Sequence, residues 1–370
     1  MNFRFIFILL LLVIQTARGQ DNSVYLTGTI GKYPVCFTIY CSWKDGSCSG
    51  SYFYKNKKLD IDLEGKASTK DSYLLESSMY AERITLKKSG GNWVGKWSND
   101  KRNLEVNLHE VIPEKLRHNF GYLAVVKKMK AEDSWAYMRW SDLVLKEDSI
   151  TFVQGKKLTW LSDGISGFSF FTLDSTYCGS KTKIINDFLT ELYIQELEDR
   201  SVTSSWTSEP EYKAWISLDN IYLSEDFISF TWNTAGYAAH YFFSEEGFTL
   251  SLKTGQEVKL EDFIWFGKGK PLNEDNNNFG VYQADTLAPH LVKLLADLYP
   301  DSIKEAIEYG CNYKDPAGWD YPMWQLTPKG LYVGYYSGSM DMPCNYPEWA
   351  IIQYDQLRKY QNKYSKLKLP

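Results

Sequence analysis

The chain has 370 residues, of which 44% are hydrophobic and 16% aromatic, and its formal net charge is −5. This length allows two ordinary domains or one large domain. The mildly acidic charge argues against nucleic acid and anionic membranes as partners, and it is compatible with a basic partner. The 13 Trp and 27 Tyr residues favour β-rich folds and recognition surfaces, because these side chains bury large areas while keeping a polar group.

Residues 1–19 have the pattern of a secretory signal peptide. Arg4 precedes an apolar run from Phe5 to Ile14, and Ala17-Arg18-Gly19 provides a small-x-small cleavage site. The run is too short for a comfortable membrane span, and no Cys follows the cleavage site to carry a lipid. Cleavage would remove two Arg and no acidic residue, which changes the formal charge from −5 to −7. We therefore predict a soluble protein that is secreted or periplasmic.

Six Cys remain after cleavage, and an even number in an exported protein favours disulfides over a metal site. No Cys-x-x-Cys occurs and the four His are scattered, so we expect no metal and no cofactor. Among the possible pairings we favour Cys41–Cys48, which would close a hairpin, and Cys311–Cys344. Cys36 and Cys178 are then left to pair by elimination.

Residues 20–145 are predicted to form a β-rich domain, an antiparallel β-sandwich or a barrel-like fold. Seven segments are rich in β-forming residues, and turn signals such as Lys44-Asp45-Gly46-Ser47 separate them. The segments are 25–31, 35–43, 49–55, 59–65, 82–88, 93–99 and 104–110. Residues 111–150 form a mixed bridge, in which a short helix is followed by a return to strand.

Residues 146–370 are predicted to form an α+β domain, an antiparallel sheet with two main helices. Apolar residues at helical spacing mark 181–200 and 286–310, and Pro300 interrupts the second helix, where Asp301 or Ser302 could cap the next piece. Strands are expected at 222–234, 248–252, 257–260, 324–337 and 349–357. Strands grouped apart from helices indicate α+β rather than a βαβ alternation.

No nucleophile motif, zinc-protease motif or phosphate-binding glycine loop occurs in the sequence. Three acidic pairs, Glu245-Glu246, Glu261-Asp262 and Glu274-Asp275, are adjacent and would face opposite ways in strands. We expect them to be solvated charges at strand ends. We expect Trp319, Trp324 and Trp349 to pack in a core.

The stretch 228–264, ISFTWNTAGYAAHYFFSEEGFTLSLKTGQEVKLEDFI, resembles the exported domain of RsiV-type anti-sigma factors and of some polysaccharide deacetylases. Ala239-His240 matches a turn of that family, and Leu252-Lys253-Thr254-Gly255 with Leu260-Glu261-Asp262-Phe263 matches its hairpin. The chain departs from the family at Tyr237-Ala238, where the family has Gly-Gly. The resemblance covers roughly 150–365, whereas the N-terminal part resembles a secreted bacterial β-module only weakly.

The resemblance implies a binding function, because the family's exported domain senses lysozyme by direct contact. An acidic protein would complement a basic lysozyme. The irregular segments near strand ends are the expected contact regions. Their candidate residues are Tyr237 and His240 in one turn, Asn276 and Asn277 in the loop 267–280, and Tyr335, Tyr336 and Met340 near the loop 337–345.

Three functions remain open from the sequence. The first is a non-enzymatic binding protein of the bacterial envelope that recognises lysozyme or cell-wall glycan. The second is a carbohydrate-active hydrolase or esterase whose carboxylates converge only in the folded chain. The third is a structural protein of the envelope.

Overall fold

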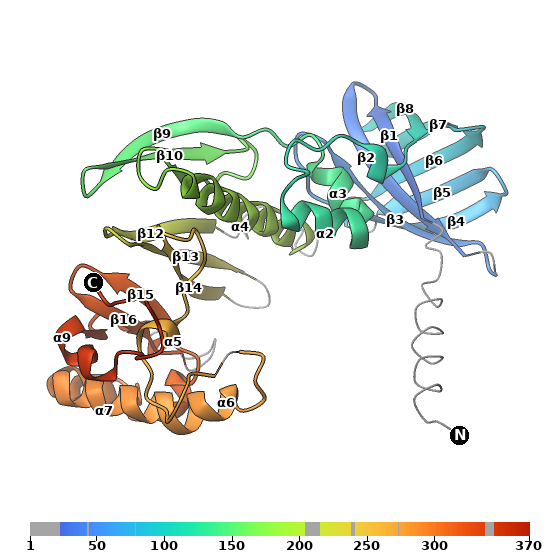
Figure 1. The fold of residues 1–370 in the computed structure, drawn as a ribbon. Coiled ribbons are helices and arrows are strands. Elements are labelled where there is room, and N and C mark those ends of the chain that lie inside the picture. The colour runs from blue at the N-terminus through green and yellow to red at the C-terminus, as the bar shows by residue number, and fades with distance from the viewer. Residues whose placement is uncertain are drawn as a thin grey trace, which may run out of the picture. The chain divides into compact units, whose positions relative to one another are not determined.

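The computed structural model describes residues 23–42, 44–77, 79–203, 215–237, 241–272, 274–336 and 344–370. The chain divides into two compact units (Figure 1). The first is drawn from Met1–Val144 and Ile194–Pro210, and the second from Leu145–Tyr193 and Glu211–Pro370. The predicted domains, 20–145 and 146–370, differ from this division because 194–210 falls in the first unit. The predicted signal peptide lies outside the described residues.

Eight antiparallel strands of the first unit form a closed barrel, in which β1 pairs with both β2 and β8. The predicted sandwich or barrel-like domain is therefore a barrel. The strands are β1 (Val24–Ile30), β2 (Tyr33–Cys41), β3 (Ser47–Tyr54), β4 (Ile61–Thr69), β5 (Ser72–Ser77), β6 (Glu82–Ser89), β7 (Asn92–Asn99) and β8 (Arg102–Glu110). No predicted strand covered β5, although Tyr73 and Leu75 alternate with outward residues.

Inward-facing side chains fill the barrel. On β2, Val35, Phe37 and Ile39 are all buried, and Phe37 stacks on Tyr52 of β3 with ring centroids 4.8 Å apart. An eight-stranded barrel leaves an interior just wide enough for side chains of this kind. The outward positions of the same strands are then available for polar residues, as the alternation of a strand requires.

Four inward-facing glycines let neighbouring strands of the barrel approach one another closely. They are Gly28, Gly50, Gly65 and Gly95. A Cβ added at any of them would lie between 1.7 and 2.2 Å from a carbonyl oxygen of the adjacent strand. The closest approach is between Gly95 and the carbonyl oxygen of Thr85, at 1.7 Å. Glycine at such positions permits the sharp local bends that close a small barrel.

The first unit also contains three short helices, of which the last packs against the outside of the barrel: η1 (Pro113–Lys115), α2 (Ala124–Glu132) and α3 (Ser134–Trp140). Asp133 caps α3 by accepting hydrogen bonds from the backbone N–H groups of Trp135 and Ala136, at 3.1 and 2.9 Å. Met138 of α3 packs on the outward-facing Cys36 and Phe53. These contacts bury one outer face of β2 and β3.

Arg139 of α3 is fully buried and pairs with two carboxylates of the first unit. Its guanidinium donates to Asp60 at 2.5 Å and to Glu198 at 2.6 Å. Trp140 also donates to Glu198, at 2.6 Å, and Trp135 donates to Asp60 at 3.2 Å. The pairing joins the β3–β4 connection, α3 and the end of α4 (Lys181–Thr203) into one polar network.

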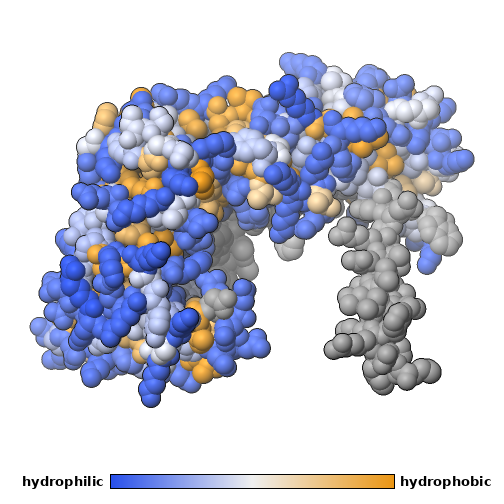
Figure 2. All heavy atoms as spheres, viewed as in Figure 1, coloured by the Kyte–Doolittle hydropathy of each residue, from blue (hydrophilic) through white to orange (hydrophobic). Residues whose placement is uncertain are grey.

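The second unit contains three small antiparallel sheets and several helices, so the predicted α+β class is confirmed. The sheets are β9 (Lys146–Val153), β10 (Lys156–Ser162) and β11 (Phe170–Leu173); β12 (Trp215–Leu223), β13 (Phe227–Tyr237) and β14 (Tyr241–Ser251); and β15 (Met323–Thr327), β16 (Gly330–Gly334) and β17 (Ile351–Ile352). The helices after α4 are α5 (Leu260–Phe263), α6 (Phe279–Tyr282), the π-helix η3 (Gln283–Leu287), α7 (Ala288–Leu298), α8 (Pro300–Glu308), η4 (Pro316–Trp319), α9 (Tyr354–Leu357) and η6 (Arg358–Tyr360). On the face shown in Figure 2, hydrophilic residues cover most of this unit.

The two predicted main helices are present, but the predicted cap of the second is wrong. Pro300 occupies the first turn of α8, and the N-cap is Tyr299 with no side-chain cap. Pro fits this position because the first turn has no partner for its backbone N–H. Asp301 and Ser302 therefore lie inside the first turn, where the negative charge of Asp301 interacts favourably with the positive end of the helix dipole. Trp319 is completely buried and Trp324 and Trp349 pack against the same core, as predicted.

The predicted hairpin at 248–263 is only partly formed. β14 ends at Ser251, and the predicted second strand, 257–260, is reduced to one bridge between Leu250 and Glu257 before α5 begins. Gly255 has a φ of +76°, and a Cβ there would lie 2.9 Å from Ile184 of α4. This turn therefore requires glycine for its conformation and for its contact with the helix.

Two of the three predicted disulfides are present, Cys41–Cys48 and Cys311–Cys344. The third pairing is wrong, because Cys36 and Cys178 are both free. Cys36 is buried beneath α3, and Sγ of Cys178, just before α4, lies 3.3 Å from the hydroxyl oxygen of Thr182. Disulfides are typical of proteins outside a reducing cytosol. Of the helices in the described residues, none is both long enough and apolar enough to cross a bilayer.

Gly95→Ala should destabilise the barrel by about 3 kcal/mol, because the new methyl group overlaps the Thr85 carbonyl. Gly91→Ala is the matched control, since a Cβ there meets nothing within 4 Å. The measurement is urea unfolding followed by Trp fluorescence. Equal midpoints for the two variants would contradict the role assigned to the close approach.

Arg139→Met should reduce the free energy of unfolding by about 3–5 kcal/mol, because Asp60 and Glu198 would stay buried without a counter-charge. Arg102→Met, at an exposed position of β8, is the control and should change the stability little. Thermal unfolding of both variants checks this expectation. It fails if the two substitutions have the same effect.

Candidate functional site

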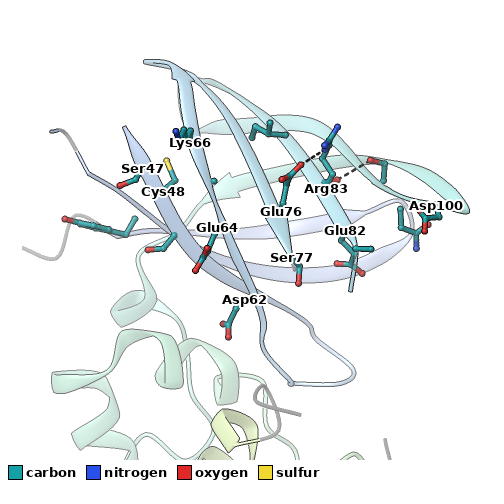
Figure 3. Close-up of a pocket in the computed structure, with 17 residues that line it drawn as sticks. Ser47, Cys48, Asp62, Glu64, Lys66, Glu76, Ser77, Glu82, Arg83 and Asp100 are labelled. Atoms are coloured by element: carbon teal, nitrogen blue, oxygen red, sulfur yellow. Dashed lines mark hydrogen bonds and ion pairs between the residues drawn. The ribbon is translucent and has the colours of Figure 1, made fainter. Parts of the chain in front are cut away.

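A groove of about 1230 Å³ runs along the barrel of the first unit (Figure 3). Strands β4, β5 and β6 supply most of its charged side chains, and the turn between β7 and β8 supplies the rest. These side chains are Asp62, Glu64, Lys66, Glu76, Glu82, Arg83 and Asp100. In Figure 3, Glu76 lies between Cys48 toward one end of the groove and Asp100 toward the other, and Glu64 lies nearer to Cys48.

The groove is strongly acidic. Its lining contains five carboxylates and only two basic side chains, Lys66 and Arg83. Arg83 is already paired with Glu76, at 2.6 Å, so its charge is largely committed within the protein. The side chains of Glu64 and Asp100 form neither an ion pair nor a hydrogen bond with any described residue. The groove therefore presents uncompensated negative charge to solvent.

Glu64 and Glu76 lie directly opposite one another on β4 and β5. Both face outward, and residues paired in this way have Cβ atoms about 5 Å apart, at which like charges destabilise a sheet. The β4–β5 ladder begins at this pair, so Ile61–Leu63 have no partner on β5. A carboxylate pair and a stretch of free strand edge thus meet in the same part of the groove.

Inward-facing residues also line the groove, among them Glu82 and Ser77. Glu82 accepts a hydrogen bond from the hydroxyl of Tyr52, and burial together with this carboxylate raises the pKa of Tyr52 far above its usual value. Ser77 is buried, and its hydroxyl has no hydrogen-bond partner in the described part of the chain. A buried hydroxyl without a partner is uncommon, because it has lost its hydrogen bonds to water.

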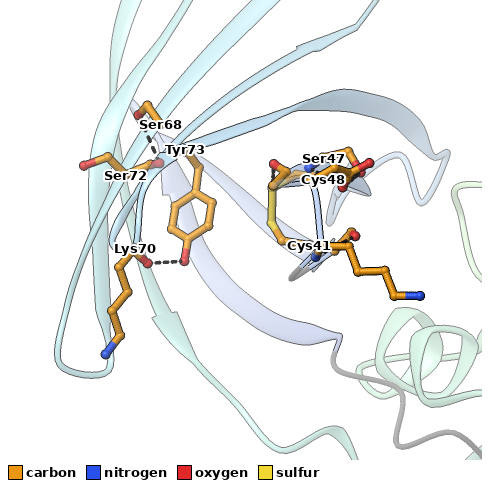
Figure 4. Close-up of a disulfide and its surroundings, with 11 residues drawn as sticks. Cys41, Ser47, Cys48, Ser68, Lys70, Ser72 and Tyr73 are labelled. Atoms are coloured by element: carbon orange, nitrogen blue, oxygen red, sulfur yellow. Dashed lines mark hydrogen bonds between the residues drawn. A yellow bond between two sulfur atoms is a disulfide. The ribbon is translucent and has the colours of Figure 1, made fainter.

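The Cys41–Cys48 disulfide fixes one end of the groove (Figure 4). The predicted turn at 44–47 precedes Cys48, and there Asp45 accepts hydrogen bonds from the hydroxyl and the backbone N–H of Ser47, at 2.7 and 3.0 Å. These hydrogen bonds lower the pKa of Asp45 to about 2. A charged Asp45 therefore stabilises the turn that sets the β2–β3 register at the groove.

The predicted partner-binding residues lie in the second unit. Tyr335 is only 4% exposed and packs edge-to-face on Tyr313 and Trp319, so it is a core residue and not a contact residue. Tyr336 is 46% exposed, with its ring 6.1 Å from that of Tyr346.

Asn276 and Asn277 are exposed in the predicted loop 267–280, but Asn276 uses its side chain locally. It accepts a hydrogen bond from the backbone N–H of Asn278 at 3.0 Å. His240 and Met340 lie outside the described residues, and Tyr237 is the last residue of β13. The structure therefore offers Tyr336 and Asn277 as exposed candidates in this unit.

Two of the acidic pairs were wrongly predicted to be fully solvated. Glu261 is only 9% exposed, and burial raises its pKa to about 7. Glu245 is half-buried, and burial, with the neighbouring charges of Asp219 and Glu348, raises its pKa to about 7. The reason is tertiary: β15 and β16 cover the sheet that carries Glu245, and α5 carries Glu261 into a core.

The groove could not be predicted from the sequence, because no strand is predicted at β5. The alternation of Asp62, Glu64 and Lys66 in LDIDLEGK does indicate that these side chains share one face of a strand. What the sequence lacks is the neighbouring strand, which brings Glu76 opposite Glu64. No protein-family model matches the chain, and no curated protein is significantly similar to it. The family resemblance of 150–365 therefore remains a prediction.

The stability of the protein should fall as the pH rises from about 4.5 to about 7. In this range the folded state keeps protons on Glu245 and Glu261 that the unfolded chain has released, so it binds more protons. The free energy of urea unfolding measured across this range checks the slope. Glu245→Gln and Glu261→Gln should each flatten it, and an unchanged slope in both variants would contradict the assignment.

Proposed function

We propose that this is an exported, non-enzymatic binding protein whose barrel groove binds a basic protein, with a c-type lysozyme as the first partner to test. The observation that carries the proposal is the excess of carboxylates over basic side chains in one groove. Complementary charge of this kind raises the encounter rate with a basic partner and excludes acidic ones. The family resemblance of the second unit suggests the same partner.

The arrangement of Glu64 and Glu76 favours binding over a purely structural role. Two carboxylates placed opposite one another on neighbouring strands reduce the stability of the barrel. A Lys or Arg side chain approaching from solvent would relieve this repulsion. The groove would therefore gain electrostatic stabilisation when a basic partner is bound.

Glu64→Lys should have opposite effects on stability and on binding. The new Lys would face Glu76 across the strands, which should stabilise the barrel by about 0.2–1 kcal/mol. The same change should weaken lysozyme binding about tenfold or more, which is about 1.4 kcal/mol or more. Calorimetric titration with lysozyme and thermal unfolding of the mature protein measure the two effects.

The matched control is Glu105→Lys, which makes the same change in net charge at an exposed position of β8 that does not line the groove. The wild-type protein should bind with micromolar or better affinity, and binding should weaken as salt screens the charges. Equal loss of binding in Glu64→Lys and Glu105→Lys would show a general charge effect and overturn the groove as the site. No binding by the wild type would overturn lysozyme as the partner.

A carbohydrate-active hydrolase is the second candidate, and the paired carboxylates of the groove favour it. Glycosidases commonly use two carboxylates that flank the scissile bond. Glu64 and Glu76 would be the pair, and Glu76 forms an ion pair with Arg83. Release of reducing ends from peptidoglycan by the wild type, abolished in Glu64→Gln, would support this function over simple binding.

A further inference from the structure

A buried amide oxygen on β13 has no hydrogen-bond donor. Asn233 is 7% exposed, and its Nδ2 donates to Oδ2 of Asp219 at 2.9 Å. Its Oδ1 has no partner among the described residues. A buried acceptor left in this state costs about 1–3 kcal/mol, so a missing donor is the expected explanation.

The register of the sheet shows what faces this oxygen. Asn233 lies on the central strand, between Ser217 of β12 and Glu245 of β14. Nδ2 donates to Asp219 on the β12 side, and Glu245 is the residue paired with Asn233 on the β14 side. Residues paired across strands share one face, so an amide oxygen without a hydrogen-bond partner and the carboxyl group of Glu245 lie on the same face of the sheet.

Further negative charge and aromatic rings surround this pair within the second unit. Asp219 and Glu348 are the charges that act on Glu245, and Tyr332 and Tyr346 lie within electrostatic reach of the same carboxylate. Tyr346 has a φ of +54°, a conformation that non-glycine residues rarely adopt and that often marks a functional position. The neighbours of the pair are thus two carboxylates and two Tyr side chains.

A metal ion does not fit this arrangement. No group of three or more His, Cys, Asp and Glu side chains in the described part of the chain is placed to chelate one. A primary ammonium group fits better, because it is larger and carries three N–H donors with a positive charge. One donor could reach Asn233 Oδ1, and the others could reach the carboxylates, with the Tyr rings favouring the cation.

We propose that Asn233, Glu245 and Asp219 form a binding site for a primary ammonium group, such as that of an amino sugar or of a lysine side chain. The ligand would supply the donor that Asn233 Oδ1 lacks and neutralise the surrounding carboxylates. The site belongs to the second unit and does not depend on the function proposed for the barrel groove.

The test is calorimetric or NMR titration of the intact mature protein with glucosamine and with lysine amide. N-acetylglucosamine and glucose are the matched probes without the ammonium group. We expect the two amines to bind in the millimolar range and the neutral sugars not to bind. Preference for glucosamine would identify an amino sugar as the source of the ammonium group, and preference for lysine amide would identify a peptide.

Glu245→Gln should weaken amine binding about tenfold or more, because it removes the charge and places an amide donor beside Asn233. Glu246→Gln is the control, since Glu246 is adjacent on β14 but points to the other face, and its affinity should match the wild type. Equal binding of amines and neutral sugars would overturn the proposal. Unchanged amine affinity in Glu245→Gln would also overturn it. The absence of any amine binding would overturn it too, and would indicate that a proton on Glu245 is the missing donor.

Discussion

The barrel depends on the close approach of its strands at four inward-facing glycines. At these positions the backbone of one strand occupies the space that a side chain would need, and this permits the bends by which β1 meets β8. Closure gives every strand of the ring two neighbours, although Ile61–Leu63 of β4 have no partner on β5. It also fixes which residues face outward, and the acidic groove follows from that alternation rather than from any local charge motif.

The second unit is organised around β13, whose residues from Phe227 to Asn233 are all buried. Such a strand can carry polar side chains only where partners are built in. The hydroxyl of Ser229 accepts from the backbone N–H of Leu326 at 3.0 Å, which fixes β15 on this face of the sheet. Asn233 lies further along the same face, and its Oδ1 has no hydrogen-bond partner among the described residues. This unsatisfied acceptor is the reason for proposing that Asn233 binds a ligand.

The sequence was sufficient for the features that depend on local patterning. Alternation predicted seven barrel strands, helical spacing predicted α4, and the seven-residue separation of Cys41 and Cys48 indicated their pairing. Features that depend on contacts between distant segments could not be predicted from local patterns. The opposition of Glu64 and Glu76 needs the β4–β5 register. The burial of Glu245 depends on β15 and β16, which lie far along the chain, and the burial of Glu261 depends on a helix that replaces an expected strand.

The two cysteines that remain unpaired differ in what can reach them. Cys36 is enclosed by the helix that covers the barrel, whereas Cys178 is half-buried in the second unit. A thiol reacts with a reagent only when the reagent can approach it. In the folded protein, Cys178 is therefore the thiol that a reagent can reach. A fluorophore attached at Cys178 would report on the second unit alone. Labelling of Cys36 would show that α3 has moved away from the barrel.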